Sequence, residues 1–308
     1  MVGPAPTLPG ILGASAPKIN NADMKSYGWE MELSWRDRIE DFNYGVRFTL
    51  ADGQRKVLKY PNESGDIYSW YNNKLDGTIW GYTTVGIAQT QEEMNAHLAN
   101  NKPNWGSNWG AGDIMYADLN GDGEVTSGSK TLNDHGDLKV IGNSYARYNF
   151  GFTVDGSWRG LDFSIFLQGT MKRDYWLDGP YFWGASGDEW QSACFTEHLD
   201  YWTPEHTNAY YPKPYFGNIK KNQEVQSGYL QNAAYLRVKN VQVGYTLPKS
   251  WTKKAAMESV RFYVSGDNLL TWTGISSIFD PETLGGDWGP GKLYPLQRTL
   301  SVGVNVNF

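Results

Sequence analysis

Apolar and polar residues alternate in several stretches of the chain, and aromatic or β-branched side chains fill many of the apolar positions. Side chains two residues apart lie on the same face of a β-strand, so this period predicts strands with one apolar and one polar face. The stretches are WEMELSW at 29–35, FNYGVRFTL at 42–50, YNFGFTV at 148–154, LDFSIFL at 161–167, VQVGYTL at 241–247, VRFYVSG at 260–266 and TLSVGVNVNF at 299–308. The pattern therefore predicts an all-β fold with seven strands.

The predicted strands are joined alternately by short and long connections. The short connections are 37–41, 155–160 and 248–259, and the long ones are 51–147, 169–234 and 269–295. Outer-membrane β-barrels have short periplasmic turns and long extracellular loops, so this alternation predicts a segment of a large antiparallel transmembrane barrel. Loops this long are uncommon unless they are functional, and we expect ligand contacts there.

The composition agrees with a β-rich protein. The 308 residues include 14 Trp, 20 Tyr, 12 Phe and 35 Gly, which favour strands and turns. No apolar run reaches the roughly 18 to 20 residues of a membrane-spanning helix. The mean hydropathy of −0.55 still suits a barrel, because its strands alternate lipid-facing and lumen-facing side chains. The net charge of −6 disfavours a nucleic-acid partner.

Two features indicate that the chain is part of a longer protein. Seven strands are too few for the barrel that such long loops normally crown, so further strands are expected upstream. The first 21 residues lack a basic segment followed by an apolar one, so no signal peptide is predicted. We therefore interpret residues 1–308 as part of a larger β-barrel whose remaining strands come from upstream sequence.

The stretch DLNGDGEV at 118–125 is similar to the start of a calcium loop. It places side-chain oxygens at alternate positions, a glycine at the sharp turn and a backbone carbonyl after it, as calcium sites do. An EF-hand carries a bidentate glutamate at the twelfth position, but Ser129 stands there, so Asp134 or Asp137 would complete the site. The alternative is a turn that only shapes the loop. The candidate calcium ligands are Asp118, Asn120, Asp122, Glu124 and Asp134.

The second and third long connections are rich in aromatic residues, which in the second stand among carboxylates. Aromatic faces stack on sugar rings and carboxylates accept hydrogen bonds from sugar hydroxyls, so these residues are candidate glycan contacts. Packing within the loops or contact with a partner protein is the alternative. The candidate ligand-binding residues are Trp176, Trp183, Trp190 and Trp288. Trp272 and Tyr294 are expected in the same connection as Trp288.

No sequence motif indicates catalysis. Adjacent carboxylates such as Asp188 and Glu189 do not define the pair of a glycoside hydrolase, which needs residues from separate strand ends. The four histidines show no metal-ligand spacing, and Cys194 has no partner for an internal disulfide. Phosphate loops, nucleophile elbows and zinc signatures are absent from the sequence. The chain is predicted not to be an enzyme.

Ten stretches, in order, resemble the C-terminal half of the SusC/RagA family of TonB-dependent transporters. They are LPGILG, NWGAGDIMYADLNGDGEV, KVIGNS, RYNFGF, GLDFSIFLQG, YWTPEHTNAYYPKP, YLRVKNVQVGYTLP, RFYVSGDNLLTWT, DPET and YPLQRTLSVGVNVNF. The resemblance implies that residues 1–308 are the C-terminal part of a TonB-dependent receptor β-barrel, with the plug domain and signal peptide absent. It implies that the complete barrel is filled by an N-terminal plug domain and lies in the outer membrane of a Gram-negative bacterium. It also implies a SusD-like lipoprotein partner and coupling to the TonB complex through the missing N-terminal part.

Three functional hypotheses follow. The leading one is a transporter fragment that lies in outer-membrane lipid and imports large nutrients, with glycan oligosaccharides first among them. The alternatives are a soluble β-rich carbohydrate-binding module and a glycan-cleaving enzyme. A soluble module would bury its apolar strand faces, whereas a barrel wall would expose them to lipid.

Overall fold

The computed structural model describes residues 2, 3, 11, 13, 17–184, 194–215, 221–285, 289, 291–294 and 296–308. Most of the strand residues that the structure describes lie in one antiparallel sheet with the order β16-β15-β14-β12-β11-β4-β3, and the short β13 (Asp174–Tyr175) pairs with β14 beside this path. Its long strands are β3 (Asp23–Ile39), β4 (Phe42–Lys59), β11 (Arg147–Trp158), β12 (Leu161–Lys172), β14 (Gln231–Thr246), β15 (Ser259–Gly274) and β16 (Thr299–Asn307). Each long strand pairs with its neighbours among these seven along the chain, so the predicted antiparallel arrangement of the seven strands is confirmed.

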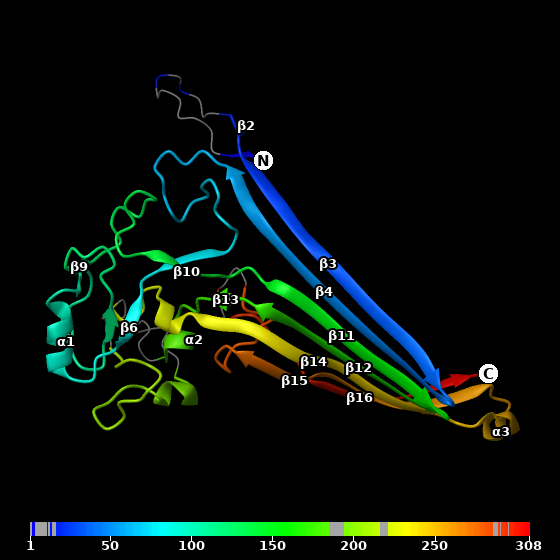
Figure 1. Cartoon of the computed structure of the whole chain (residues 1–308). Helices are drawn as coiled ribbons and strands as arrows, with labels where there is room; N and C mark the ends of the chain where they lie inside the picture. The colour runs from blue at the N-terminus through cyan, green and yellow to red at the C-terminus, as the bar shows by residue number, and fades with distance from the viewer. Residues whose placement is uncertain are drawn as a thin grey trace.

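The connections follow the predicted parity. Residues 40–41, 159–160 and 247–258 join strands at one end of the sheet, which we call the short-turn end (Figure 1). Residues 60–146, 173–230 and 275–298 join them at the opposite end. The sheet is open: β3 and β16 are its two edges and do not pair with each other.

Several strands run further than their alternation predicted. β4 continues to Lys59 although residues 51–59 are mostly polar, because its backbone stays paired with β3 and gains bonds to residues of the first long connection. β15 continues to Gly274, so Trp272 lies in this strand and not in the third long connection. Backbone pairing extends a strand where side-chain periodicity has ended, and the sequence pattern does not report it.

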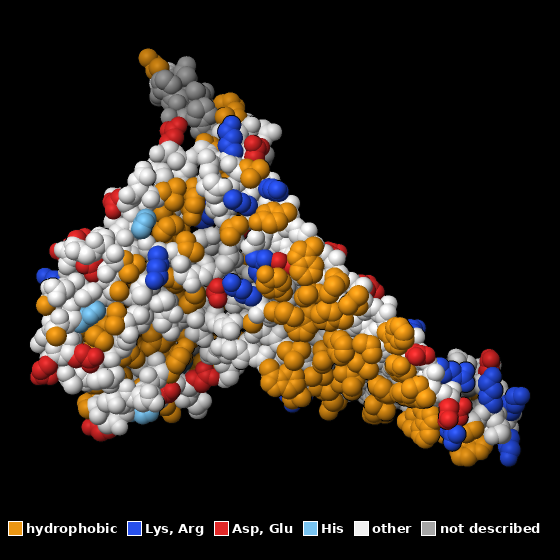
Figure 2. All heavy atoms as spheres, in the orientation of Figure 1, with side chains coloured by type: hydrophobic (Ala, Val, Ile, Leu, Met, Phe, Trp, Pro, Cys, Tyr) orange, Lys and Arg blue, Asp and Glu red, His pale blue; other side chains and the backbone are white. Residues whose placement is uncertain are grey.

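One face of the sheet is apolar and exposed. The register places one row of apolar side chains across all seven long strands: Ile39, Phe42, Trp158, Leu161, Tyr245, Phe262 and Val304. Exposure reaches 77% at Leu300 and 83% at Val302 on β16. Figure 2 shows the resulting continuous hydrophobic surface over the long strands. A water-soluble protein rarely exposes an apolar patch of this extent.

The opposite face of the sheet is polar and carries ion pairs between strands. Arg261 on β15 donates to Asp162 on β12, with Nε 2.9 Å from Oδ2. Arg47 on β4 lies 3.3 Å from Glu32 on β3. The first pair reaches across β14 and the second joins neighbouring strands, and both lie on the side away from the apolar row, as expected of a barrel lumen.

The hydrophobic core does not lie under the sheet but within the long connections. These contain β5 (Thr78–Gly81) paired with β10 (Lys139–Asn143), β6 (Thr84–Ile87) with β8 (Ile114–Tyr116), and β7 (Lys102–Pro103) with β9 (Glu124–Val125). They also contain α1 (Gln91–Leu98), α2 (Pro180–Trp183), η3 (Thr196–Leu199) and η5 (Ser227–Tyr229). Away from them lie β1 (Val2–Gly3), paired with β2 (Ile19–Asn20), and the turn elements α3 (Lys249–Thr252) and η6 (Lys253–Ala255). Among the described residues, no helix is long and apolar enough to cross a membrane.

Candidate functional site

The long connections fold together into one assembly beyond the ends of the strands opposite the short-turn end (Figure 1). A single cluster of buried side chains draws on all three connections: Ile67, Tyr82 and Tyr116 come from the first, Phe182 and Tyr211 from the second, and Ile275, Phe279 and Leu284 from the third. Each connection therefore buries apolar surface against the others, and the assembly has a core of its own.

The predicted tryptophans differ in their positions. Trp183 is buried in this core, 5.0 Å from the ring of Tyr229 and 5.1 Å from that of Phe182. Trp176 is partly buried against the same core, 6.0 Å from the Trp183 ring. Trp190 and Trp288 lie outside the described residues. Burial of Trp183 favours its packing role, and ligand contact by the four tryptophans stays a prediction.

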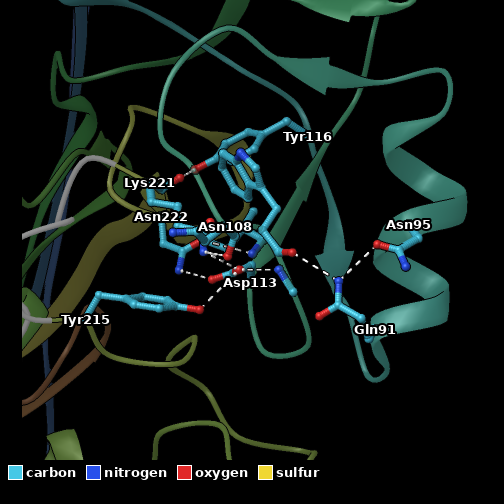
Figure 3. A network of polar contacts seen from close by, with 11 residues as sticks. Gln91, Asn95, Asn108, Asp113, Tyr116, Tyr215, Lys221 and Asn222 are labelled. Carbon is cyan, nitrogen blue, oxygen red and sulfur yellow. Dashed lines mark hydrogen bonds and ion pairs between the residues drawn. The ribbon is translucent and has the colours of Figure 1, made fainter.

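A buried ion pair joins the first and second connections (Figure 3). Lys221 Nζ lies 2.7 Å from Asp113 Oδ2, and both side chains are fully buried. Lys221 also donates to the Asn108 carbonyl at 2.6 Å, while Asn222 and Tyr215 donate to Asp113. Burial, with Asp113 as a second cause, raises the pKa of Tyr215, so its hydroxyl stays protonated and donates.

A second ion network ties the third connection to the sheet. Arg237 on β14 is 2% exposed and lies on the polar face. Its Nη2 donates to Asp280 at 2.8 Å, its Nη1 lies 2.8 Å from Glu282, and its Nε donates to Thr271 at 2.8 Å. Lys239 reaches Glu282 at 2.9 Å. The segment 280–282 is therefore fixed over the polar face at the mouth of the sheet.

Sequence periodicity does not predict these two networks, because their members lie in different connections or strands. One signal existed for the second network: the stretch DPET carries both Asp280 and Glu282. Nothing local marks Asp113 or Lys221, since a buried pair is defined only after the two connections pack.

The predicted calcium loop is an exposed turn held by its own carboxylates. Asp118 accepts backbone N–H bonds from Asn120, Gly121 and Gly123 at 3.0, 2.6 and 2.8 Å. These bonds, that from Gly123 first, lower the pKa of Asp118. Asp122 accepts from the Glu124 N–H at 2.9 Å. This is the geometry of a turn stabilised by Asx side chains.

The expected closing ligand has other partners. Asp134 accepts from the Ser129 hydroxyl at 2.5 Å and from the Ser129 N–H at 2.9 Å, and the Ser129 hydroxyl is the first cause that lowers its pKa. Asp137, the alternative, is buried and accepts from the backbone of Leu119 and Thr126. Within the described residues, no three His, Cys, Asp or Glu side chains are grouped so that they could hold a metal ion. Calcium stays a prediction.

A polar cavity of about 350 Å³ opens between the second and third connections. Its walls include two carboxylates, two tyrosines, an amide and a serine: Glu197, Asp200, Tyr210, Tyr211, Gln231 and Ser276. Glu197 accepts from the Ser276 hydroxyl at 2.7 Å, and Gln231 donates to the Tyr210 hydroxyl at 2.9 Å. Hydroxyl, amide and carboxylate groups beside aromatic rings suit a polyhydroxylated or hydrogen-bonding ligand. None of these six residues is among the ligand-binding residues predicted from the sequence.

Together these features define a class of protein. The chain is a segment of a β-barrel wall with an apolar outer face and a polar inner face, and its long connections fold into one assembly at one end. The structures that it resembles agree with this class. It matches the RagAB peptide importer in an open-open state with a TM-score of 0.70 and 21% identity, over 100% of this chain and 31% of that one. A second RagAB peptide transporter structure gives a TM-score of 0.67 over 98% of this chain.

Curated relatives resemble the chain over nearly its whole length. TonB-dependent receptor P3 of Formosa agariphila is 26% identical over 98% of this chain, and TonB-dependent receptor SusC of Bacteroides thetaiotaomicron is 22% identical over 94%. No protein-family model matches the chain. The predicted resemblance to SusC/RagA-type TonB-dependent receptors is thus confirmed. The chain spans 30% of the length of the first relative and 27% of that of SusC.

Proposed function

We propose that this chain forms part of the wall and outer mouth of a TonB-dependent transporter in the outer membrane of a Gram-negative bacterium. The observation that carries the proposal is the division of one seven-strand meander into an exposed apolar face and an ion-paired polar face. Lipid would cover the first face and the lumen would lie along the second. The relatives, which are named TonB-dependent receptors, support the same role.

The substrate that we propose is a large nutrient, with glycan oligosaccharides as the first class to test. The polar cavity beside Glu197, Asp200 and Tyr210 offers acceptors and aromatic surface for sugar hydroxyls and rings. A SusD-like lipoprotein is the proposed partner at the assembly of long connections. Energy coupling to TonB is proposed to use parts of the longer protein outside this chain.

Growth of a strain that depends on the full-length transporter tests this function. Deletion of its gene is expected to abolish growth on one class of oligosaccharide as sole carbon source while growth on monosaccharide continues. Glu197→Gln and Asp200→Asn are expected to weaken uptake of that class and leave the amount of receptor in the outer membrane unchanged. If the deletion strain loses growth only on peptides, the proposed substrate class changes from glycan to peptide. If the receptor is found in the soluble fraction, the proposed transporter function is wrong.

The soluble carbohydrate-binding module receives no support from the structure, because the apolar strand faces lie on the surface and are not buried against a second layer. A catalytic role is not proposed. The cavity contains the carboxylates of Glu197 and Asp200, but both already have partners: Glu197 accepts from the Ser276 hydroxyl, and Asp200 Oδ1 lies 2.7 Å from His206 Nε2.

A further inference from the structure

The turn between β14 and β15 at the short-turn end is unlike the other two. It holds twelve residues with the helical turns α3 and η6, whereas the other turns hold two residues each. Its Trp251 is 63% exposed, although Thr252 beside it is buried. A tryptophan that projects from a turn at the edge of an apolar surface is typical of a membrane interface, because its ring is apolar and its N–H seeks a polar partner.

This turn is also basic. Lys249, Lys253 and Lys254 are all exposed, and Glu258 is the one acidic residue of 248–258. No ion pair joins any of these lysines to a described carboxylate. Figure 2 shows Lys and Arg side chains gathered at this end, next to the hydrophobic surface. The positive charge is therefore available to a ligand outside the chain.

A groove on the apolar face leads to this turn. It has a volume of about 410 Å³, and its apolar lining residues are Phe42, Trp158, Leu161, Phe163 and Val243. The Thr246 N–H bonds to the Gly160 carbonyl at 2.7 Å, so the turn between β11 and β12 lies beside the start of the basic turn. Arg159 in that turn lies over the Trp158 ring at 5.4 Å and its Nε donates to Asp41 at 3.0 Å, so the unpaired positive charge beside the groove is that of the lysines. Apolar groove and basic surface are thus continuous.

We propose that the short-turn end binds an anionic phospholipid. The lysines around Trp251 contact the headgroup phosphate, and an acyl chain lies in the groove along Trp158 and Leu161. The ligand is chosen by charge complementarity and by continuity with the lipid-facing surface, since a cationic cluster at the edge of an apolar belt is where anionic headgroups meet a membrane protein. The inference rests on the membrane location proposed above and adds a lipid selectivity that transport itself does not require.

Native mass spectrometry of the full-length transporter tests this site. The protein is reconstituted in nanodiscs that contain phosphatidylcholine and phosphatidylglycerol, and the lipids that remain bound after release from the nanodisc are counted. The variant Lys249→Gln/Lys253→Gln/Lys254→Gln is compared with Lys102→Gln/Lys130→Gln/Lys139→Gln. The second set neutralises three exposed lysines in the first long connection, far from the short-turn end.

Wild type and the control variant are expected to retain phosphatidylglycerol preferentially, and the first variant to lose this preference. A lysine near an anionic surface contributes about fivefold in affinity, so three give on the order of a hundredfold at low salt. The preference is also expected to fall in high salt for the wild type. Equal retention by both variants would overturn the headgroup contact.

Two further outcomes separate this inference from the proposed function. Leu161→Asn in the groove is expected to shorten phosphatidylglycerol residence without changing the charge of the turn; an unchanged residence would overturn the acyl groove. Failure of the wild type to enter nanodiscs at all would reject the membrane location and not the lipid selectivity alone. Substitution of the three lysines is expected to leave nutrient uptake in the growth assay unchanged.

Discussion

Replacement of Lys221 by methionine is the sharpest test of how the long connections are held together. Lys221 belongs to the second connection and Asp113 to the first, and both side chains have no exposed surface. Methionine keeps most of the side-chain volume and its apolar contact with the Tyr215 ring, over which the ammonium lies at 4.1 Å. The substitution therefore removes a charge and leaves the packing nearly intact.

The expected cost follows from the burial of the remaining partner. Removal of one member of a buried ion pair destabilises a protein by about 3–5 kcal/mol, because the other charge is left without compensation. Asp113 still accepts hydrogen bonds from Gly110, Asn222 and Tyr215, so the expected destabilisation lies near the lower end of this range. About 3 kcal/mol corresponds to roughly a hundredfold change in a local opening equilibrium.

Hydrogen exchange of the full-length protein in detergent measures this opening. Lys221→Met is expected to speed exchange of the 110–116 backbone about a hundredfold and to leave the long strands unchanged. The double variant Lys221→Met/Asp113→Asn is expected to recover all but about 1–2 kcal/mol of the lost stability. The remainder is lost because the new amide leaves one donor unmatched. Lys139→Met is the exposed control. Unchanged exchange in Lys221→Met, or no recovery in the double variant, would refute the argument.

Three further predictions concern other parts of the chain. Arg237→Met is expected to destabilise the segment 275–285 by about 3 kcal/mol, because Asp280 and Glu282 would lose their buried partner; exchange of that segment measures it, and unchanged exchange would contradict it. Leu300→Lys is expected to cost about 2–4 kcal/mol in lipid and reduce heat-resistant folded barrel on gels, whereas Ser301→Lys on the polar face should assemble normally; equal yields would argue against the assigned faces. Burial lowers the pKa of His97 below its ordinary value of 6.5, so the unfolded state binds a proton at higher pH than the folded state. The stability that α1 has above pH 6.5 should fall as pH drops through the folded pKa, with faster helix exchange that His97→Gln abolishes.

The sequence alone determined the architecture of the sheet. Alternation in seven stretches predicted the strands, their faces and their order. Successive side chains of a strand point to opposite faces, so the order of apolar and polar residues shows the period of two directly. The parity of connection lengths likewise predicted which ends of the strands meet. Strand ends were less well predicted: residues 51–59 of β4 and Trp272 of β15 pair through their backbone, which carries no residue pattern.

Only the tertiary structure decided how the long connections are used. The aromatic residues of these connections were visible in the sequence, but whether a ring such as Trp183 is buried or faces a ligand depends on which segments pack against it. Asp113 and Lys221 stand far apart along the chain, and only the fold brings them together. Contacts between distant segments arise only when the whole assembly packs. Local periodicity therefore determines the sheet of this protein, whereas the structure of its long connections is determined by the tertiary fold.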